Sequence, residues 1–415
     1  MHVSNDTSGG AGRAARRVHQ GLLKRGIRSS MFVRYGEPDD RSIIGYDVDS
    51  SLSATVRRFL RYVWMRSDFF PRYVSWPVGG MPLSDDRSRF AGEVFRQLPS
   101  FDILQLHWVA EFIDIPFVLK NVDSPVVWRL PDMYAFTGGC HYTSGCQRFG
   151  KACGCCPQLG SSESSDPSRR SWRRKRSAYK QLVDEDRLHI VATSTWLKNK
   201  AKKSTLFRDV PVYRIPNSLD IRVFKPKKFK KRKKKIGIKS SSKVILFVAQ
   251  NSEDERKGLE LLKSALYSIE YEEAVLLSVG KKNPTIESNI NHVHIGYINN
   301  DEKLSELYSM ADVFVIPSLQ EAFGQTALEA MACGTPVVGF DAGGIPDMVR
   351  PGETGWLAET GNVRSLRDAI DAALESDEDR ERMGRRCREV VEEEYTLERQ
   401  AEQYTALYES ILSQQ

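Results

Sequence analysis

The stretch that decides the fold runs Val313-Phe-Val-Ile-Pro-Ser-Leu-Gln-Glu-Ala-Phe-Gly-Gln-Thr-Ala-Leu-Glu-Ala-Met-Ala-Cys-Gly-Thr-Pro-Val-Val-Gly-Phe340. It opens and closes with uninterrupted apolar runs, 313–316 and 337–340, which are typical of strands buried on both faces of a parallel sheet. Apolar side chains recur at helical spacing in between, at Leu328, Met331 and Ala332. Gly334-Thr-Pro336 then ends the helix. The stretch therefore predicts a strand, a loop, a helix and a second strand.

The predicted helix begins near Gln325, directly after Phe323-Gly324. The backbone N–H groups of a first helical turn have no partner within the helix, and the helix dipole adds positive charge there. This helix start follows the carboxyl end of a parallel strand, where open α/β sheets bind their ligands. We therefore expect an anion, most simply a phosphate, on the N–H groups of Phe323, Gly324 and Gln325.

Two carboxylates flank this predicted anion site. Glu321 lies in the loop before the helix, and Glu329 lies one turn inside it. Carboxylates beside an anion are unfavourable unless they accept hydrogen bonds from hydroxyls, and a sugar nucleotide carries hydroxyls on both sides of its phosphates. We expect Glu321 to bind sugar hydroxyls and Glu329 to bind ribose hydroxyls. The alternative is that both are solvated residues at a helix start, where the dipole favours them.

The run from Glu321 to Pro336 resembles the signature of the family-four retaining glycosyltransferases of the GT-B fold, the glycosyl transferases group 1. Three further motifs continue the resemblance in the family's order: His294-Ile-Gly-Tyr297, Gly343-Gly-Ile-Pro346 and Gly352-Glu-Thr-Gly355. The resemblance covers most of the chain. It implies an α/β protein with two Rossmann-like domains facing a deep cleft, and a C-terminal helix that crosses back to the first domain.

The resemblance also implies the domain boundaries. Pro216-Asn-Ser-Leu-Asp220 is similar to the family's interdomain segment, so that an N-terminal acceptor-side domain would cover 1–216. A nucleotide-sugar-binding domain would follow over 217–395, and the returning helix would cover 396–415. The length of 415 residues suits two domains with separate cores. Only the residues from Met1 to Val3 are available for a first strand, so we expect that strand to be short.

Several donor-binding residues follow from the resemblance alone. After the predicted strand 244–248, Lys257 matches the lysine with which the family clamps the donor diphosphate. The family's arginine position is Asn251 here, and Arg256 is the nearest cationic substitute. Tyr297 lies where the family receives the nucleotide base. Asn217, in the interdomain segment, completes this set of expected contacts.

In the first domain, Gly9, Gly10 and Gly12 precede a helical pattern and would let the backbone approach a phosphate or the acceptor. His107 and Asp132 come at the ends of predicted strands, where functional groups collect in such sheets. We consider both as catalytic candidates, although each could be structural. The family commonly has a histidine directly before the position of Asp132, and this chain has Pro131 there. His107 or His141 could replace that histidine only if the fold brings one of them to the donor.

Four cysteines, Cys140, Cys146, Cys153 and Cys156, fall within a glycine-rich insert over 138–158. The last two form a C-x2-C pair followed by proline, which lets two thiolates bind one tetrahedral ion. The insert resembles one in a bacterial polysaccharide-synthesis branch of the family. We expect a structural zinc ion rather than disulfides, and no catalytic metal; buried free cysteines are the alternative.

The composition describes a globular chain, with 40% hydrophobic residues and a mean hydropathy of −0.43. No apolar run approaches membrane-spanning length, and the first residues lack the features of a signal peptide. We therefore expect a cytoplasmic protein. Its net charge of +7 includes basic stretches over 169–176 and 225–235. We expect these to dock the protein on the inner face of the plasma membrane; solvated loops are the alternative, and no motif indicates a nucleic-acid partner.

Together these features predict an enzyme, a retaining hexosyltransferase-type glycosyltransferase. It would move a sugar from a nucleotide-diphosphate sugar to a glycan or lipid-diphosphate-linked acceptor in the synthesis of an exopolysaccharide. Three alternatives stay open at this point: a catalytically impaired protein that only binds sugar nucleotides, a GT-B sugar-nucleotide epimerase, and a protein that binds nucleic acid through the lysine-rich stretch 225–235. The paired carboxylates and the cysteine insert favour transfer.

Overall fold

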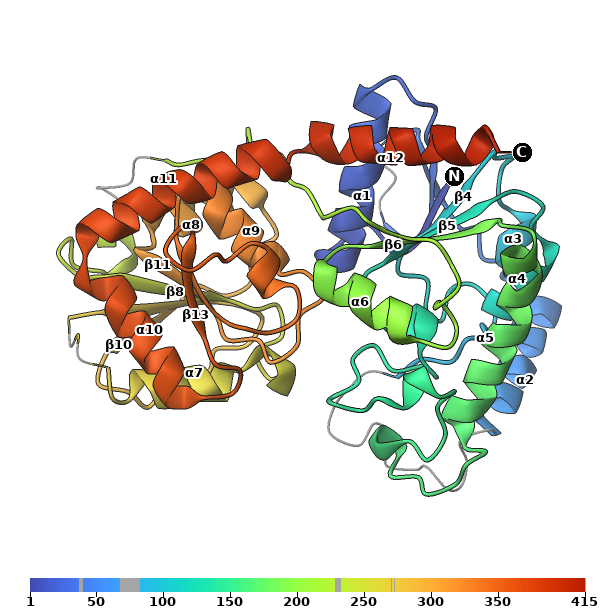
Figure 1. The fold of residues 1–415 in the computed structure, drawn as a ribbon, viewed down its shortest axis with the longest axis horizontal. Coiled ribbons are helices and arrows are strands. Elements are labelled where there is room, and N and C mark those ends of the chain that lie inside the picture. The colour runs from blue at the N-terminus through green and yellow to red at the C-terminus, as the bar shows by residue number, and fades with distance from the viewer. Residues whose placement is uncertain (37–39, 68–82, 228–232, 270, 272, 415) are drawn as a thin grey trace. The chain divides into compact units, whose positions relative to one another are not determined.

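The computed structural model describes residues 1–36, 40–67, 83–227, 233–269, 271 and 273–414. The chain divides into two compact units, one made of 1–216 with 400–415 and the other of 217–399. Each unit contains one fully parallel sheet (Figure 1). The predicted α/β class with parallel sheets is therefore confirmed.

The sheet of the first unit has seven strands in the order β3-β2-β1-β4-β5-β6-β7. Its strands are β1 His2–Asp6, β2 Met31–Tyr35, β3 Ile43–Gly45, β4 Leu104–Leu106, β5 Val126–Leu130, β6 Leu188–Ala192 and β7 Val212–Arg214. Its helices are α1 Gly9–Lys24, α2 Leu52–Ser67, α3 Glu93–Arg96, α4 Ile115–Asn121, α5 Pro167–Asp184 and α6 Thr195–Lys203. The first strand is longer than predicted, because polar Ser4, Asn5 and Asp6 continue the ladder beside β2.

The sheet of the second unit has six strands in the order β10-β9-β8-β11-β12-β13. They are β8 Val244–Val248, β9 Val275–Val279, β10 Asn291–His294, β11 Val313–Ile316, β12 Val337–Phe340 and β13 Gly355–Ala358. The helices are α7 Leu259–Leu266, α8 Asp301–Met310, α9 Gln325–Ala332, α10 Val363–Glu375 and α11 Asp377–Glu394. The last helix, α12 Leu397–Leu412, begins at the end of this unit.

The core of the second unit lies on both faces of its sheet, because successive strand residues point to opposite sides. In β11, Phe314 and Ile316 pack in a cluster with residues of α8, α9 and α11. Val313 and Val315 pack on the other face with residues of α7 and α10. This two-sided burial explains why the run has no polar residue, and it fixes the strand–loop–helix–strand unit in place.

In the first unit, α1 and α12 cover one face of the sheet. Val18 and Leu22 of α1 pack with Tyr404, Leu407 and Ile411 of α12 and with apolar residues of β5 and β6. Residues 400–415 are therefore part of the core of the first unit. Within the described residues, no helix is both long and apolar enough to cross a membrane.

Candidate functional site

The candidate site of the second unit lies where β8 and β11 end. These two strands are neighbours, and the chain continues from β8 toward one edge of the sheet and from β11 toward the other. Loops that follow such a pair diverge and leave a crevice at the carboxyl ends of the strands. The loop 249–258 follows β8, and the loop 317–324 follows β11. The topology therefore brings together two loops that the sequence separates by more than fifty residues.

A lysine and a carboxylate meet between these two loops. Lys257 Nζ donates to Glu321 Oε2 at 2.6 Å, and Arg256 Nη1 lies 3.8 Å from the same oxygen. The Glu321 side chain is only 13% exposed. Burial alone would raise the pKa of Glu321, but the charges of Lys257 and Arg256 outweigh it and hold that pKa below its ordinary value. Glu321 is thus an ionised carboxylate beside two cations.

The loop after β8 is braced against the loop after β11. Arg256 donates from Nη1 to the carbonyl of Gln320 at 2.9 Å and accepts from Leu319 N through its own carbonyl at 2.8 Å. Gly258 follows in a left-handed conformation, with φ of 70°. A Cβ at Gly258 would stand 1.8 Å from the Pro317 carbonyl oxygen, so the two loops approach too closely for any side chain there.

A third loop holds the backbone of Glu321 from the other side. Gly344 N donates to the Glu321 carbonyl at 2.8 Å. Gly343 has φ of 60°, and a Cβ there would lie 1.9 Å from the same carbonyl oxygen. The pair Gly343-Gly344 therefore positions Glu321 by close backbone approach. This gives a structural reason for the glycines in the motif that the sequence analysis identified.

Helix α9 begins at Gln325, as the sequence predicted, and no side chain caps it. Its N-cap residue is Gly324, which has φ of 99°. Both polar atoms of the Gln325 side chain are buried without a hydrogen-bond partner in the described part of the chain. A buried amide without a partner, at the start of a helix that no side chain caps, is the arrangement that an anionic or polar ligand would satisfy.

Glu329 is the more deeply placed of the two predicted carboxylates. It is 4% exposed, and its Oε2 accepts from the Tyr308 hydroxyl at 3.1 Å. Tyr308 lies on α8 and is fully buried in the core of the unit. The sequence analysis did not identify Tyr308, because a tyrosine at helical spacing has no signal that separates a core residue from one that orients a carboxylate.

The remaining predicted donor contacts lie around this site in different environments. Asn251 is exposed, and its Oδ1 accepts from Glu253 N at 3.2 Å in a local turn. Asn217 is buried at the start of the unit. Tyr297 is 47% exposed, with Lys281 Nζ 5.7 Å from its ring centroid. Tyr297 thus presents a ring that is free to stack, as the prediction of a base site requires.

Residues 228–390 match the glycosyl transferases group 1 family. The matched residues lie within the second unit, 217–399, and make up most of it. N-acetyl-alpha-D-glucosaminyl L-malate synthase of Bacillus anthracis is 30% identical over 204 residues, which are 48% of this chain and 53% of that protein. MMP alpha-(1->4)-mannosyltransferase of Mycolicibacterium hassiacum is 30% identical over 211 residues, 48% of each chain. The chain thus spans about half the length of these curated relatives.

Solved structures resemble the whole chain. Sucrose-phosphate synthase from Thermosynechococcus elongatus has a TM-score of 0.64 at 19% identity, covering 100% of this chain and 96% of that one. Anabaena HepE in complex with UDP-glucose has a TM-score of 0.65 at 14% identity, covering 99% of each chain. Identities this low support the fold alone. These structural matches and the two parallel α/β sheets confirm the predicted fold class, GT-B.

In the first unit, β1 and β4 are the corresponding neighbouring strands, from which the chain continues toward opposite edges of the sheet. A Cβ at Gly12 would lie 2.1 Å from Asp6 Oδ1, so the start of α1 requires glycine there. Gly9 has φ of 64°, whereas a Cβ at Gly10 would meet open space. Burial raises the pKa of Asp6 above its ordinary value of 3.8. Of the three glycines, Gly12 is required by a close approach to Asp6 and Gly9 by its left-handed backbone, whereas Gly10 meets neither demand.

His107 directly follows β4, and its side chain is buried. It is 1% exposed, and its Nε2 is 3.0 Å from Nδ1 of His2 on the neighbouring strand. Burial, followed by the charge of Arg129, lowers the pKa of His107 well below its ordinary value, so the ring is neutral. This placement favours the structural alternative for His107, because strand burial leaves its ring no path to a ligand.

Asp132 follows β5 and forms part of a hydrogen-bonded chain of side chains. Its Oδ2 is 2.7 Å from His141 Nδ1, and His141 Nε2 is 3.0 Å from Ser84 Oγ. Tyr134 stacks on the His141 ring at 5.1 Å between centroids, and its backbone N donates to Asp132 Oδ1. Of the two candidate histidines, the fold therefore brings His141 to Asp132. Nothing in the sequence indicated Ser84, which lies 57 residues before His141.

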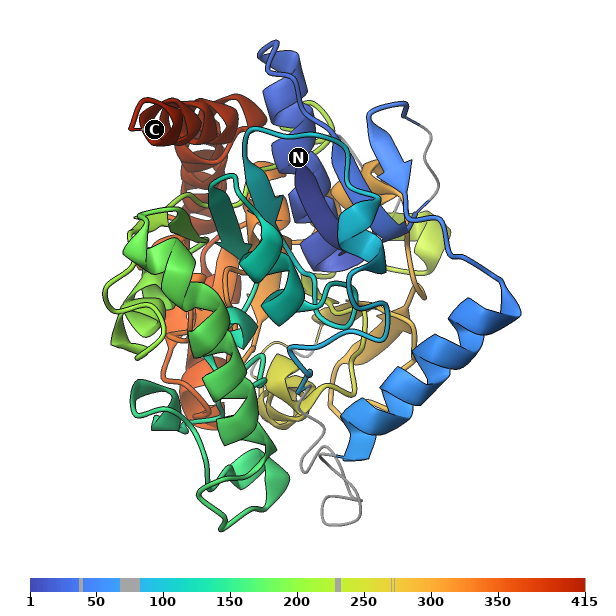
Figure 2. The same ribbon diagram turned by 90° about the vertical axis from the view of Figure 1, so that its right-hand side faces the viewer.

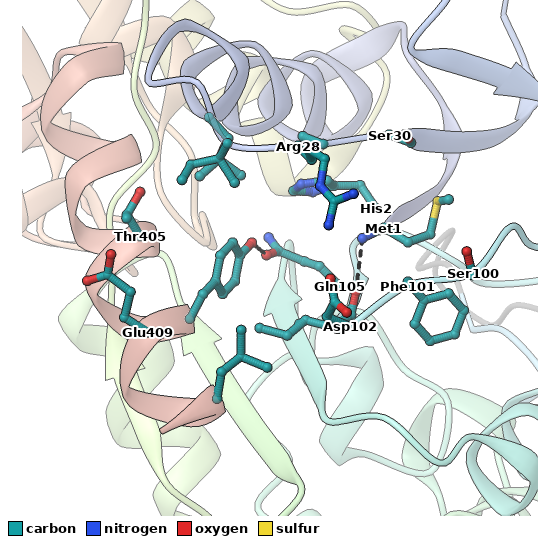
Figure 3. Close-up of a pocket in the computed structure, with 16 residues that line it drawn as sticks. Met1, His2, Arg28, Ser30, Ser100, Phe101, Asp102, Gln105, Thr405 and Glu409 are labelled. Carbon is teal, nitrogen blue, oxygen red and sulfur yellow. Dashed lines mark hydrogen bonds between the residues drawn. The ribbon is translucent and has the colours of Figure 1, made fainter. Parts of the chain in front are cut away.

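A cavity of about 470 Å³ opens at the opposite edge of this sheet, at the amino ends of β1 and β4 (Figure 3). Met1, Gln105 and Tyr408 are among its lining residues, and the Met1 amino group donates to the Ile103 carbonyl at 2.9 Å. Open α/β sheets bind ligands at the carboxyl ends of their strands. This cavity is therefore not the site that the topology predicts.

The four predicted metal ligands line one small cavity in the first unit. Cys140, Cys146, Cys153 and Cys156 surround a space of about 20 Å³, which Cys155 does not line. Burial raises the pKa of Cys153 to about 12, so its thiol is neutral as it stands. Among the described residues, no group of three or more Cys, His, Asp or Glu side chains is arranged to hold a metal ion. Cysteine side chains that share one cavity suit a metal ion. Their positions in this structure do not form a set of metal ligands.

Proposed function

We propose that the chain is a retaining glycosyltransferase that moves a sugar from a nucleotide-diphosphate sugar to a glycan or lipid-linked acceptor in cell-surface polysaccharide synthesis. The observation that carries the proposal is the Lys257–Glu321 pair beside the uncapped start of α9. The family match supports glycosyl transfer, and the HepE complex supports a nucleotide sugar as the donor.

When the donor binds, Lys257 and Glu321 would separate, and each would contact a group of the donor instead. Without a ligand, Lys257 and Glu321 satisfy each other's charge. A diphosphate over the first turn of α9 offers Lys257 a stronger partner with two negative charges, and the sugar offers Glu321 hydroxyl donors. Gln325 would supply the amide that the described residues leave without a partner. Glu329, oriented by Tyr308, would accept from the ribose.

The chemistry then follows from charge development on the leaving group. The bond between the sugar's anomeric carbon and the diphosphate oxygen breaks, and negative charge grows on that oxygen. Lys257 and the N–H groups at the start of α9 are placed to stabilise it. The acceptor oxygen bonds to the same face of the anomeric carbon, and its proton passes to the departing phosphate oxygen. This scheme uses no metal ion.

We place acceptor recognition at the carboxyl edge of the first sheet, at Asp132 and the glycine loop. The hydrogen bond from His141 fixes the direction of the Asp132 carboxylate. His141 therefore acts as a positioning residue in this proposal, in the region where the family's histidine is replaced by Pro131.

Exchange of Glu321 for glutamine tests the proposal. Glu321→Gln removes the charge but keeps the size, so UDP binding, which relies on Lys257 and α9, should persist while sugar transfer falls about a hundredfold. Glu260→Gln is the matched control, because Glu260 pairs with Lys263 at 2.8 Å on the exposed surface of the same unit. Transfer by Glu321→Gln at the wild-type rate would refute the assignment.

Measurements on the wild type separate this proposal from a protein that only binds sugar nucleotides and from an epimerase. A protein that only binds sugar nucleotides would be stabilised thermally by UDP-, GDP- or ADP-sugars, yet would neither transfer nor hydrolyse any of them. An epimerase would convert the sugar without an acceptor. Asn251 favours the first of these, impaired binding. Its side chain accepts a hydrogen bond in a local turn and cannot supply the paired, positively charged N–H groups of an arginine.

We propose a structural zinc ion at the cysteine cavity. Four cysteines of one short segment line this cavity, and as thiolates they would complete a closed tetrahedral set around the ion and release their protons on binding. Metal analysis of the purified chain should find about one zinc ion per chain, lost on exchange of Cys153 and Cys156 for serine. A folded chain without metal would remove this proposal.

We also propose peripheral contact with the inner face of an anionic membrane, where a lipid-linked acceptor would lie. The basic stretches contribute less to this than the sequence suggested. In 169–176, Lys175 is fully buried and Arg174 pairs with Asp86. Residues 228–232 of the second stretch lie outside the described residues, and Lys233 pairs with Asp312 at 3.4 Å.

A further inference from the structure

Helix α2 is attached to the first unit along one narrow stripe. Ala54, Arg58 and Met65 are its buried residues, and with Arg61 they recur at helical spacing. Arg58 Nη1 bonds Glu93 at 3.1 Å and Arg61 Nη2 bonds Asp114 at 2.6 Å. Two arginines in ion pairs therefore hold the helix to its unit. Most helices are held by apolar side chains instead. Figure 2 shows α2 at the margin of the unit, with one long side turned away from it.

The opposite stripe of α2 is apolar and exposed. It comprises Leu52, Val56, Phe59, Leu60 and Val63, which follow the spacing of one helical face. Leu52 is 80% exposed, Phe59 63% and Leu60 61%. Tyr62 and Trp64 are exposed at its margins. Most of the large hydrophobic side chains that the described residues expose thus lie on this one helix, and a contiguous apolar face of this kind marks an interaction surface.

The charge of α2 indicates what covers this face. The helix has four arginines and no acidic residue. Arg58 and Arg61 face the unit. Arg57 is 63% exposed although its Nη2 lies 3.4 Å from Glu93 Oε1, and Arg66 lies exposed against the Tyr62 ring. An apolar stripe with aromatic residues and arginines at its margins is the composition of helices that lie in the interface of an anionic bilayer.

We propose that α2 docks the first unit on an anionic membrane, with Phe59, Leu60 and their neighbours inserted at the boundary between headgroups and acyl chains. At 16 residues, the helix would lie in the membrane plane over about 24 Å. This deepens the proposed function by naming the surface at which a lipid-linked acceptor would be met. Lipid binding requires neither donor nor catalysis, so it can be tested separately.

Vesicle flotation of the full chain tests the docking. The wild type should bind vesicles of phosphatidylcholine mixed with phosphatidylglycerol more tightly than phosphatidylcholine alone, and added salt should weaken that binding. Phe59→Ser with Leu60→Ser should reduce binding about tenfold or more, as should Arg57→Glu with Arg66→Glu. Tyr267→Ser is the matched control, because Tyr267 is also 63% exposed but lies in the other unit. Thermal stabilisation by the sugar nucleotide should be the same in all variants.

Three outcomes would overturn the proposal. One is a wild-type chain that floats with neither vesicle. Another is wild-type binding by the Phe59→Ser, Leu60→Ser variant, which would place the lipid contact elsewhere. The third is a dimer in sedimentation that this variant converts to a monomer, because a second copy would then cover the stripe. Phe59→Tyr keeps the aromatic ring and should retain flotation, which controls for a folding defect in the serine variant.

Discussion

At the scale of single residues, Glu321 is fixed by two other loops, the one after β8 and the one after β12. Lys257 binds its carboxylate, Arg256 binds the backbone just before it, and Gly344 binds its own carbonyl. The carboxylate is thus placed by the backbone as well as by its charge, which is how a site keeps a reactive group in one orientation. The glycines beside it matter because they have no side chain.

Gly343→Ala should displace Glu321. The new Cβ would stand 1.9 Å from the Glu321 carbonyl oxygen, so the loop must move, in addition to the strain of φ at 60°. We expect a loss of about 2–4 kcal/mol in unfolding free energy and a large loss of transfer. Gly352→Ala is the control, because its φ of 79° gives similar strain but its Cβ would meet open space. Equal effects in calorimetry would contradict the close-approach argument.

The depressed pKa of Glu321 predicts how its contribution to stability depends on pH. A carboxyl whose folded pKa lies below its unfolded value of 4.5 stabilises the fold above pH 4.5, and this is lost as pH falls through the folded pKa. Wild type should exceed Glu321→Gln by about 1–2 kcal/mol at neutral pH. The difference, measured in urea titrations, should shrink as the pH falls below 4.5. A difference that grows in acid would contradict the assignment of the charge.

At the scale of elements, helix α5 is tied to the cysteine insert through its N-cap. Asp166 Oδ1 accepts from Arg169 N at 3.0 Å, which caps the helix, and Oδ2 accepts from Cys156 N at 2.7 Å. One buried carboxylate therefore fixes both the first turn of α5 and the segment that carries the last two cysteines. The order of that segment depends on a helix that begins ten residues later.

Asp166→Ala should loosen the insert. Loss of the cap and of the bond to Cys156 should cost about 1–3 kcal/mol, and the thiols of the insert should react several-fold faster with a thiol reagent. Asp184→Ala, at the exposed last residue of the same helix, is the control and should change neither quantity. Unchanged thiol reactivity in Asp166→Ala would show that the insert is held independently of α5.

At the scale of the whole molecule, each unit has its own core, but the chain ends inside the first one. Tyr404 is fully buried, and Leu407 and Ile411 pack with it against α1 and the first sheet. The first unit is therefore completed only when the last residues of the chain are present. The second unit, 217–399, has both faces of its sheet covered by its own helices.

Removal of residues 400–415 should destabilise the first unit selectively. It exposes Val18, Leu22 and Val127, which α12 covers, whereas the cores of the second unit lose nothing. Two unfolding transitions should separate in calorimetry, and a sugar nucleotide should still raise the higher one by mass action. Removal of 413–415 alone is the control. A single cooperative transition with a lowered midpoint would contradict the independence of the two cores.

The sequence by itself determined the parallel α/β class, the strands 244–248, 275–279, 313–316 and 337–340, and the start of α9. Strands covered on both faces of a sheet are mostly apolar throughout, and a helix on the sheet repeats its apolar residues at helical spacing. It also predicted Glu321 and Lys257 as candidates through the family's motifs. Only the tertiary structure decided that these two meet, because strand order brings the ends of β8 and β11 together across distant sequence. The fold likewise decided that His141, rather than His107, contacts Asp132, and that α2 exposes its apolar stripe. Periodicity shows that a helix has an apolar face, but burial depends on what the rest of the chain packs against it.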